Sequence, residues 1–363
     1  MPEAWDDYMG LQPVDLPTDL AGVRPDETEA AHQHSLSQLA HELFLPEEEL
    51  LTIDALLRDR LQIVFSGPPG TGKTFVARRL AQHYTADDDT RMAFIQFHPS
   101  YSYEDFVEGY RPKLNEELNT LTFSVEPGPL LRLVRAAQIS MDQFGDEAPP
   151  HILVIDELNR ANLGRVFGEL FFALEYRNQP VRLQYSSERP PFRLPPNVWI
   201  IGTMNTADRS IALFDAALRR RFYFVDFSPL SPPFDGVLPS FLKRLKAEGG
   251  PDLQWLDALL RHVNDNLPDR RYAVGPSYFM RKDLTEELAR RAWEYTVVPY
   301  LADRFEYQAD EGQFEWSSIK ATVFAELSES EGDAESQDGE KDPFQESQGG
   351  DDEPFPGSSA EPV

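Results

Sequence analysis

The chain has 363 residues, of which 41 % are hydrophobic and 12 % aromatic, enough for two packed domains with additional segments. It contains no cysteine, which excludes disulfide bonds and cysteine zinc sites, and no apolar run approaches the roughly 20 residues of a membrane span. The acidic start MPEAWDDYMG is unlike a signal peptide, so we expect a cytoplasmic protein.

The net charge of −28 is concentrated at the two ends of the chain. Residues 1–42 and 326–363 together carry −20, which leaves −8 for residues 43–325. Low hydropathy with high charge is typical of disorder, so we expect disordered acidic segments at 1–34 and 326–363. A generally basic nucleic-acid-binding face is absent, and contact with DNA would need a local pore or a partner.

The central part of the chain predicts a parallel sheet with helices on both faces. Helical patterns begin at Ser35 and Pro46, and the second opens with Pro46 and three glutamates, which favour a first turn. Short apolar runs then alternate with helical segments, the pattern of an α/β fold. The predicted strands are 62–66, 92–97, 152–155, 198–203 and 222–227, and the predicted helices lie at about 73–84, 129–143, 164–176 and 213–220.

Two further segments complete the predicted organisation. Residues 181–184 and 191–194 flank a turn and predict an inserted β-hairpin. From about 235 to 305 the pattern is helical only, as in a small lid domain. We therefore predict an α/β nucleotide-binding domain over 35–228 and a helical lid over 229–325.

A P-loop carries the strongest functional signal. It lies between a predicted strand and a predicted helix, so a chance glycine turn is a poor alternative. Its glycines let backbone N–H groups surround phosphates, Lys73 should reach the β- and γ-phosphates, and the Thr74 hydroxyl should bind Mg²⁺. The motif reads Gly67-Pro68-Pro69-Gly70-Thr71-Gly72-Lys73-Thr74.

Two carboxylates follow the buried strand that begins at His151. Asp156 would hold the Mg²⁺, and Glu157 would polarise the attacking water, because an in-line displacement needs a held metal and an oriented nucleophile. The alternative is a helix start that carries acidic residues. After a complete P-loop, the catalytic interpretation is favoured.

A polar residue and an arginine run complete the candidate site. Asn205 ends the predicted strand beside the metal strand and could orient the lytic water, although it could also be a turn residue. Arg219, Arg220 and Arg221 close a helix before the last strand, and at least one should point out of the subunit. A guanidinium there could meet a neighbour's γ-phosphate in a closed ring, whereas the alternative is a helix C-terminal cap.

Taken together, these motifs resemble the AAA+ domain of the McrB family, the motor subunits of McrBC-type modification-dependent restriction systems. The resemblance covers roughly residues 43–305, and a weaker likeness extends to dynein-related and MoxR-type AAA+ proteins. The most specific matches are Gln96–Gly109 (QFHPSYSYEDFVEG), Asp156–Arg160 (DELNR), Met204–Arg209 (MNTADR) and Leu218–Phe222 (LRRRF).

The resemblance implies a five-stranded sheet of order 5-1-4-3-2, a helical lid and a hexameric ring. It implies that Arg220 and Arg221 are the finger pair. It also implies Mg²⁺ with ATP or GTP as the substrate, GTP being typical of the family. The implied partner is an McrC-like nuclease subunit, which stimulates hydrolysis through the ring's centre and residues 205–209, so that DNA is engaged indirectly through the complex.

The chain also departs from the family pattern. McrB proteins typically carry an N-terminal DNA-reading domain, whereas about 42 poorly patterned residues precede the core here. The lid segment 274–279 supplies no convincing second sensor, and Arg281 is a weak candidate. The aromatic residues between Phe97 and Tyr110 could pack against the sheet or contact a partner.

Three functions remain open at this point. The first is a nucleotide-driven motor that powers a separate McrC-like nuclease in phage defence. The second is an ATP-dependent MoxR-like remodelling chaperone. The third, a scaffold that binds nucleotide without turnover, is disfavoured because a scaffold needs no base such as Glu157. No base-reading motif distinguishes ATP from GTP.

Overall fold

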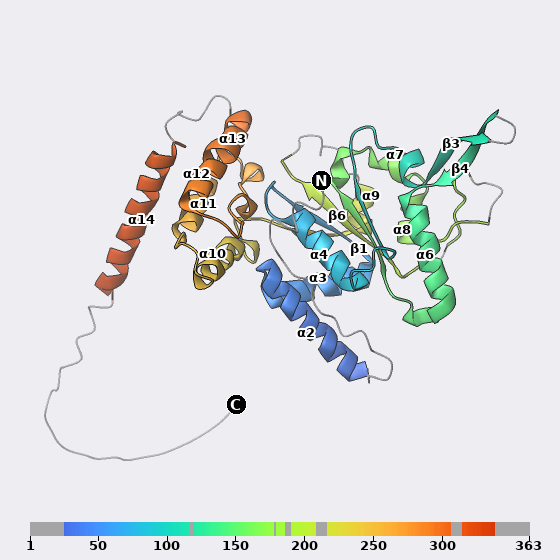
Figure 1. Ribbon diagram of the computed structural model, residues 1–363, viewed down its shortest axis with the longest axis horizontal. Helices are drawn as coiled ribbons and strands as arrows, with labels where there is room; N and C mark the ends of the chain where they lie inside the picture. The colour runs from blue at the N-terminus through green and yellow to red at the C-terminus, as the bar shows by residue number, and fades with distance from the viewer. Residues whose placement is uncertain are drawn as a thin grey trace, which may run out of the picture.

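The computed structural model describes residues 25–115, 120–177, 179–185, 190–207, 216–305 and 314–337. A parallel five-stranded sheet lies within an α/β domain, and a helical lid stands beside it (Figure 1). In sheet order its strands are β2 (Met92–Gln96), β5 (His151–Asp156), β6 (Val198–Asn205), β1 (Gln62–Gly67) and β7 (Tyr223–Asp226). When the five strands of this sheet are numbered 1 to 5 along the chain, their order, read from the β7 edge, is the predicted 5-1-4-3-2.

The alternation of side chains along the strands separates two hydrophobic cores. On β1, Ile63 and Phe65 belong to one core and Val64 to the other, because successive strand residues point to opposite faces of the sheet. The first core also contains α2 (Pro25–Leu43), α3 (Glu47–Arg60), α4 (Lys73–Thr85) and the lid. The second contains α5 (Tyr103–Phe106), α6 (Pro129–Phe144), α7 (Leu163–Phe167), α8 (Leu170–Glu175) and α9 (Ala216–Arg221).

One helix prediction and two expectations of disorder differ from the structure. The helix predicted at 164–176 is two short helices, α7 and α8, because Gly168 between them has a φ of 49°. Helix α2 begins at Pro25, inside the segment that we expected to be disordered. Helix α14 (Trp316–Gln337) continues past residue 326, also into a segment expected to be disordered, and Trp316, Ile319 and Val323 anchor it by burial at helical spacing.

A projecting β-hairpin, absent from the prediction, joins α5 to α6. Its strands are β3 (Glu108–Asn115) and β4 (Thr120–Pro127), which pair antiparallel. Most aromatic residues that precede it pack in the core, since Phe97, Tyr103 and Phe106 are buried. The packing alternative is therefore correct for that part of the segment, whereas the hairpin exposes large apolar side chains, Tyr110, Leu114, Leu121 and Phe123.

The lid is helical, as predicted. After the short turn η4 (Phe234–Gly236) it contains α10 (Val237–Ala247), α11 (Trp255–Asp265), α12 (Glu286–Ala292), the π-helical turn η7 (Trp293–Val297) and α13 (Val298–Arg304). Trp293 is fully buried at its centre, and its indole N–H donates to the Phe314 carbonyl over 2.8 Å. Helix α14 packs on α11, which extends the lid beyond residue 305.

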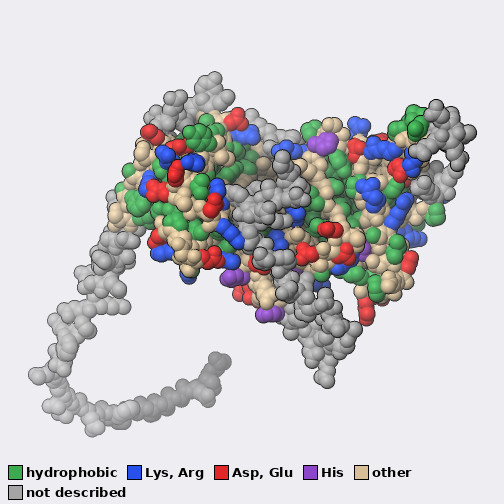
Figure 2. Space-filling model, viewed as in Figure 1, with side chains coloured by type: hydrophobic (Ala, Val, Ile, Leu, Met, Phe, Trp, Pro, Cys, Tyr) green, Lys and Arg blue, Asp and Glu red, His purple; other side chains and the backbone are tan. Residues whose placement is uncertain are grey.

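Charged side chains are unevenly spread on the face shown in Figure 2. Acidic and basic side chains are interspersed over the lid, whereas Lys and Arg side chains gather mainly toward the end that carries the β3–β4 hairpin. Any basic surface on this side is therefore local. Among the helices of the described ranges, none combines the length and the apolar character that crossing a membrane requires.

A half-buried arginine, Arg177, links the amino-terminal ends of strands β1 and β6. Arg177 donates from Nη1 to the carbonyls of Pro195 and Val198 over 3.1 and 2.6 Å, and from Nη2 to Gln62 Oε1 over 2.6 Å and to the Leu61 carbonyl over 3.3 Å. Burial lowers the pKa of Arg177 to about 9. The predicted insert at 181–194 appears nearby as a single bridge between Val181 and Phe192, and residues 186–189 of it lie outside the described residues.

We expect Arg177→Leu to lower the free energy of unfolding by about 2–4 kcal/mol, because it leaves several buried acceptors unpaired. Urea denaturation measures this change. The matched control is Lys243→Ala, a substitution of an exposed residue of α10, which should stay within about 0.5 kcal/mol of the wild type. Equal stability of the two variants would contradict the structural role of Arg177.

Candidate active site

The P-loop lies between the end of β1 and the start of α4, as predicted. Gly70 and Gly72 have φ values of 76° and 84°, in the left-handed region that favours glycine. The first N–H groups of α4 have no intrahelical acceptor, and the helix dipole adds positive potential there. The loop and the helix start therefore form an anion-binding cradle.

Lys73 lies within this cradle with 8 % of its surface exposed. Its Nζ donates to the carbonyls of Gly67 and Pro68 over 2.9 and 2.5 Å and to Thr71 Oγ1 over 3.1 Å. Burial lowers the pKa of the Lys73 ammonium to about 8, although the carboxylates of Glu157, Asp156 and Asp226 act in the opposite direction.

The Asp156 carboxylate joins three strands and the P-loop. Its Oδ1 accepts hydrogen bonds from the hydroxyls of Thr74 and Thr203, each over 2.6 Å, and its Oδ2 accepts from Gln96 Nε2 over 3.4 Å. The parallel register brings these residues together, because the carboxyl ends of β2, β5 and β6 meet at one edge. Sequence reasoning missed Thr203, whose position at the end of a buried strand was the available signal.

Oxygen ligands for Mg²⁺ are present in the predicted pair. The Thr74 hydroxyl and the Asp156 carboxylate are in contact, and such oxygens suit this hard cation. Within the described ranges, no group of three or more His, Cys, Asp or Glu side chains could hold a metal ion by itself. The arrangement therefore fits a cation that takes its remaining ligands from phosphate oxygens and water.

Glu157 and Asn205 reach the same space from neighbouring strands. Glu157 has a φ of 54°, and its backbone N–H donates to Thr203 Oγ1 over 3.2 Å. Asn205 Oδ1 accepts from the Ala207 N–H over 3.1 Å, and its side-chain amide nitrogen has no hydrogen-bond partner among the described residues. Both residues line the cleft described next, whereas Asp208 and Arg209 of the same motif lie outside the described residues.

An open cleft of about 1130 Å³ is lined by the P-loop on one side and by lid residues on the other. The lid loop is attached directly to the P-loop, because the N–H groups of Gly275 and Ser277 donate to the carbonyls of Pro69 and Gly70 over 3.2 and 2.9 Å. A Cβ at Gly275 would lie 2.1 Å from the Gly70 backbone, so only glycine allows this approach. Tyr278 lines the cleft beside Gly70.

Arginines of the lid and of α4 also line the cleft. Arg281, the weak second-sensor candidate, does so together with Arg291 and Arg78, neither of which we predicted. Arg281 pairs with Asp283 over 2.6 Å, and Arg291 pairs with Glu287 one helical turn earlier. Folding of the lid brings Arg281 and Arg291 to the cleft, so no local pattern marks these two residues.

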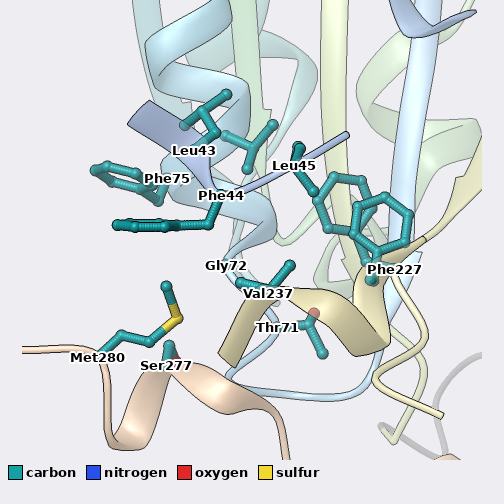
Figure 3. A pocket seen from close by; sticks show the side chains of 12 residues that line it. Leu43, Phe44, Leu45, Thr71, Gly72, Phe75, Phe227, Val237, Ser277 and Met280 are labelled. Carbon is teal, nitrogen blue, oxygen red and sulfur yellow. The ribbon is translucent and has the colours of Figure 1, made fainter. Parts of the chain in front are cut away.

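A separate apolar pocket adjoins the P-loop (Figure 3). Its volume is about 40 Å³, room for about three water molecules. Phe44 and Phe75 lie on one side with Met280 of the lid below them, and Thr71 and Ser277 bring hydroxyls to its edge. The remaining lining residues are Leu43, Leu45, Gly72, Val76, Phe227, Phe234 and Val237.

The three arginines of α9 lie outside the cleft of their own chain. None of Arg219, Arg220 and Arg221 lines the described cleft. Arg221 Nη2 pairs with Glu175 over 2.6 Å, and its side chain is 15 % exposed. Arg220 is exposed, and the described residues offer its side chain no hydrogen-bond or ion-pair partner. The two predicted finger residues therefore differ in their surroundings.

Comparison with known proteins adds family matches to this geometry. An AAA domain of the dynein-related subfamily matches residues 62–222, and the McrB alpha-helical lid domain matches residues 254–311. The type IV methyl-directed restriction enzyme EcoKMcrB subunit of Escherichia coli (strain K12) is 38 % identical over 262 residues, which cover 68 % of this chain and 53 % of that protein.

Two further relatives are more distant. The type II restriction enzyme BsuMI component YdiS of Bacillus subtilis (strain 168) is 29 % identical over 201 residues, covering 46 % of this chain and 56 % of that protein. Neuron navigator 2 of Homo sapiens is 22 % identical over 293 residues, covering 75 % of this chain and 10 % of that protein. The chain thus spans about half the length of the two restriction proteins.

The pKa of Lys73 predicts a pH dependence of nucleotide binding. Above about pH 8 the free protein has lost the Lys73 proton, so binding of a triphosphate must take one up again. We expect the affinity for Mg²⁺–ATP or Mg²⁺–GTP to fall between about pH 7.5 and about pH 9.5, at most tenfold per unit. Fluorescence titration with a labelled nucleotide measures it.

The control is Lys73→Ala. It should bind weakly throughout this pH range and lack the dependence. Tight binding by this variant would contradict the assignment of the phosphate site, and a flat profile in the wild type would contradict the role of the buried ammonium.

Proposed function

We propose that this chain, which belongs to the McrB family of AAA+ nucleoside-triphosphate hydrolases, is the motor subunit of a restriction complex. The observation that carries the proposal is the convergence of Lys73, Thr74, Asp156 and Glu157 on one cleft, which a McrB-type lid closes on the other side. Phosphate cradle, metal ligands and a candidate base are the parts that triphosphate hydrolysis requires.

In this proposal the P-loop binds the phosphates through backbone N–H groups and Lys73. Thr74 and Asp156 hold Mg²⁺, which neutralises charge on the phosphates when it is bound. Lys73 Nζ donates to carbonyls of the P-loop itself, so it would exchange these acceptors for phosphate oxygens when a nucleotide binds.

Glu157 is the proposed general base, and Asn205 the residue that orients the attacking water. The Glu157 backbone is held by Thr203, the residue that also bonds Asp156, so base and metal ligand share one support. Asn205 ends the adjacent strand, and its amide nitrogen can donate to a water in the cleft.

The apolar pocket of Figure 3 is the proposed site of the nucleobase. Its lining offers mainly aromatic and aliphatic surface, and the Thr71 hydroxyl at its edge already donates to the Pro68 carbonyl and accepts from Lys73. Selection between ATP and GTP would therefore rely mainly on backbone groups. Since the pocket is smaller than a purine, Phe44 or Met280 must shift when a base enters.

Arg220 is the proposed finger that completes a neighbour's site in a ring, in the family a hexamer. It is exposed and lacks a partner within the described part of its own chain, whereas Arg221 is anchored by Glu175. A finger must be free to reach another subunit, so we assign the trans-acting role to Arg220 and an anchoring role to Arg221. Of the two predicted finger residues, this proposal therefore retains Arg220 alone as the finger.

We further propose an McrC-like nuclease as the partner that supplies DNA cleavage. The two restriction proteins among the relatives support this class of complex. The net charge of −28 opposes nonspecific binding of DNA by this chain, because such affinity comes largely from lysine and arginine. Engagement of DNA would then occur through the complex.

We predict that Glu157→Gln keeps nucleotide bound while cutting turnover by roughly 10²-fold or more, the range for loss of a general base. Phosphate release and nucleotide titration measure the two effects. Loss of binding together with turnover would point to a folding defect, and turnover at the wild-type rate would exclude Glu157 as the base.

The finger assignment predicts different outcomes for neighbouring residues. Arg220→Ala should bind nucleotide normally and hydrolyse at least about tenfold more slowly. Mixed with Glu157→Gln subunits it should regain activity, because an intact base then faces an intact finger. The matched variant Arg221→Ala should lose stability more than turnover. Activity of Arg220→Ala in an isolated monomer would contradict action between subunits.

The partner can be tested by adding the product of a neighbouring nuclease gene. Hydrolysis should rise several-fold, and Asn205→Ala should reduce this stimulation more than basal turnover. The chain alone should bind duplex DNA with a dissociation constant above roughly 10⁻⁵ M at physiological salt and cleave nothing. DNA cleavage by the purified chain, or hydrolysis that does not change when the nuclease is added, would contradict the motor assignment.

A further inference from the structure

The turn after the metal strand carries two residues without an assigned role. This turn, η2 (Leu158–Arg160), follows Glu157 directly and contains Asn159 and Arg160 of the Asp156–Arg160 run. Both side chains contact groups of the proposed hydrolytic site. One touches the base, and the other touches the strand that ends in Asn205.

Arg160 lies against the carboxylate of Glu157. Its Nε is 3.3 Å from Glu157 Oε2, and this oxygen is buried. The Glu157 side chain as a whole is 21 % exposed and lines the cleft. Arg160 therefore contacts the buried oxygen of a carboxylate that lines the cleft.

Without such a contact the carboxylate would be weakly positioned. The Glu157 backbone is fixed in the left-handed region by the bond to Thr203, but that bond does not restrain the side chain. A general base must come within hydrogen-bond reach of its water, and rotation about the side-chain bonds removes it from that position. The guanidinium opposes this rotation by attracting one oxygen.

Asn159 fastens the same turn to the neighbouring strand. It is 8 % exposed, and its Nδ2 donates to the Asn205 carbonyl over 3.1 Å. Its Oδ1 is buried and has no hydrogen-bond partner among the described residues. A single bond thus links the turn that carries Arg160 to the residue proposed to orient the water.

We propose that Arg160 is a positioning residue for hydrolysis, holding the Glu157 carboxylate toward the cleft while Asn159 fixes this turn against the end of β6. Base and water-orienting residue are then held by consecutive residues of one turn, so a shift at the end of β6 also moves the base. This inference rests on the proposed function, in which Glu157 is the base.

The ion pair between Arg160 and Glu157 contributes little to the free energy of unfolding, because it is partly exposed to solvent. The Arg160 side chain is 47 % exposed, and pairs of this exposure stabilise a protein only weakly. Loss of Arg160 should therefore appear in the rate of hydrolysis and leave the melting temperature and nucleotide affinity nearly unchanged. A purely structural residue would show the opposite pattern.

The test is single-turnover hydrolysis of Mg²⁺–GTP and Mg²⁺–ATP by Arg160→Ala, Arg160→Lys and Asn159→Ala. Each is made in the wild type and in Glu157→Gln. The control is Arg165→Ala, an exposed arginine outside the cleft. We expect Arg160→Ala to slow hydrolysis roughly tenfold, a part of what a general base contributes, with a dissociation constant within about twofold. Arg160→Lys should hydrolyse faster than Arg160→Ala but more slowly than the wild type. The control Arg165→Ala should hydrolyse at the wild-type rate.

The decisive result is the comparison between backgrounds. Because Arg160 acts through Glu157, Arg160→Ala should not slow the Glu157→Gln variant further. Asn159→Ala also releases Asn205, so it should slow the Glu157→Gln variant less than it slows the wild type. Equal slowing in both backgrounds, a rate like that of the Arg165→Ala control, or parallel loss of nucleotide affinity would overturn the inference while leaving the proposed function intact. Wild-type hydrolysis by Glu157→Gln alone would overturn both.

Discussion

The carboxylate of Asp156 accepts hydrogen bonds from three different elements, the P-loop helix, strand β6 and strand β2. A partly buried charge is costly unless it is satisfied, so these donors are held where the carboxylate needs them. Thr203 then passes the restraint on to the Glu157 backbone. The relative positions of the phosphate cradle, the candidate metal ligand and the candidate base therefore depend on the Asp156 carboxylate. The parallel register of β2, β5 and β6 brings its hydrogen-bond donors to this edge of the sheet.

A second restraint connects the cleft to the lid. The lid loop donates two backbone hydrogen bonds to Pro69 and Gly70, and Gly275 approaches the P-loop too closely for any side chain. Any movement of the P-loop on phosphate binding is thus transmitted to the lid without an intervening side chain. The lid in turn carries Met280 against the apolar pocket (Figure 3). Arg281 of the lid lines the cleft. Both ends of a bound nucleotide would then depend on one backbone contact.

Under the proposed function, the separation of the candidate base from the candidate finger makes hydrolysis depend on assembly. Glu157 lines the cleft, whereas Arg220 lies on α9 and does not. The two helices that carry the phosphate site and the arginines pack on opposite faces of the sheet, so no rotation of a side chain can bring them together. Under the proposed function, each site is completed by another subunit, and strand β6 is the element that links the two regions within one chain.

Sequence alone determined the sheet and most of the site. Buried parallel strands read as apolar runs, and the P-loop, Asp156, Glu157 and Asn205 sit at their carboxyl ends, so local pattern and topology predict their convergence. Family resemblance supplied the strand order and the lid. The strands, the P-loop and the carboxylates could be read because each depends on residues close in the chain.

Only the tertiary structure decided the rest. The attachment of Gly275 to the P-loop, the arginines across the cleft and the different surroundings of Arg220 and Arg221 all join segments far apart in sequence. The β3–β4 hairpin was missed because its apolar residues are exposed and pack against no core that a pattern could reveal. Contacts of this kind depend on how whole elements pack, which no local periodicity encodes.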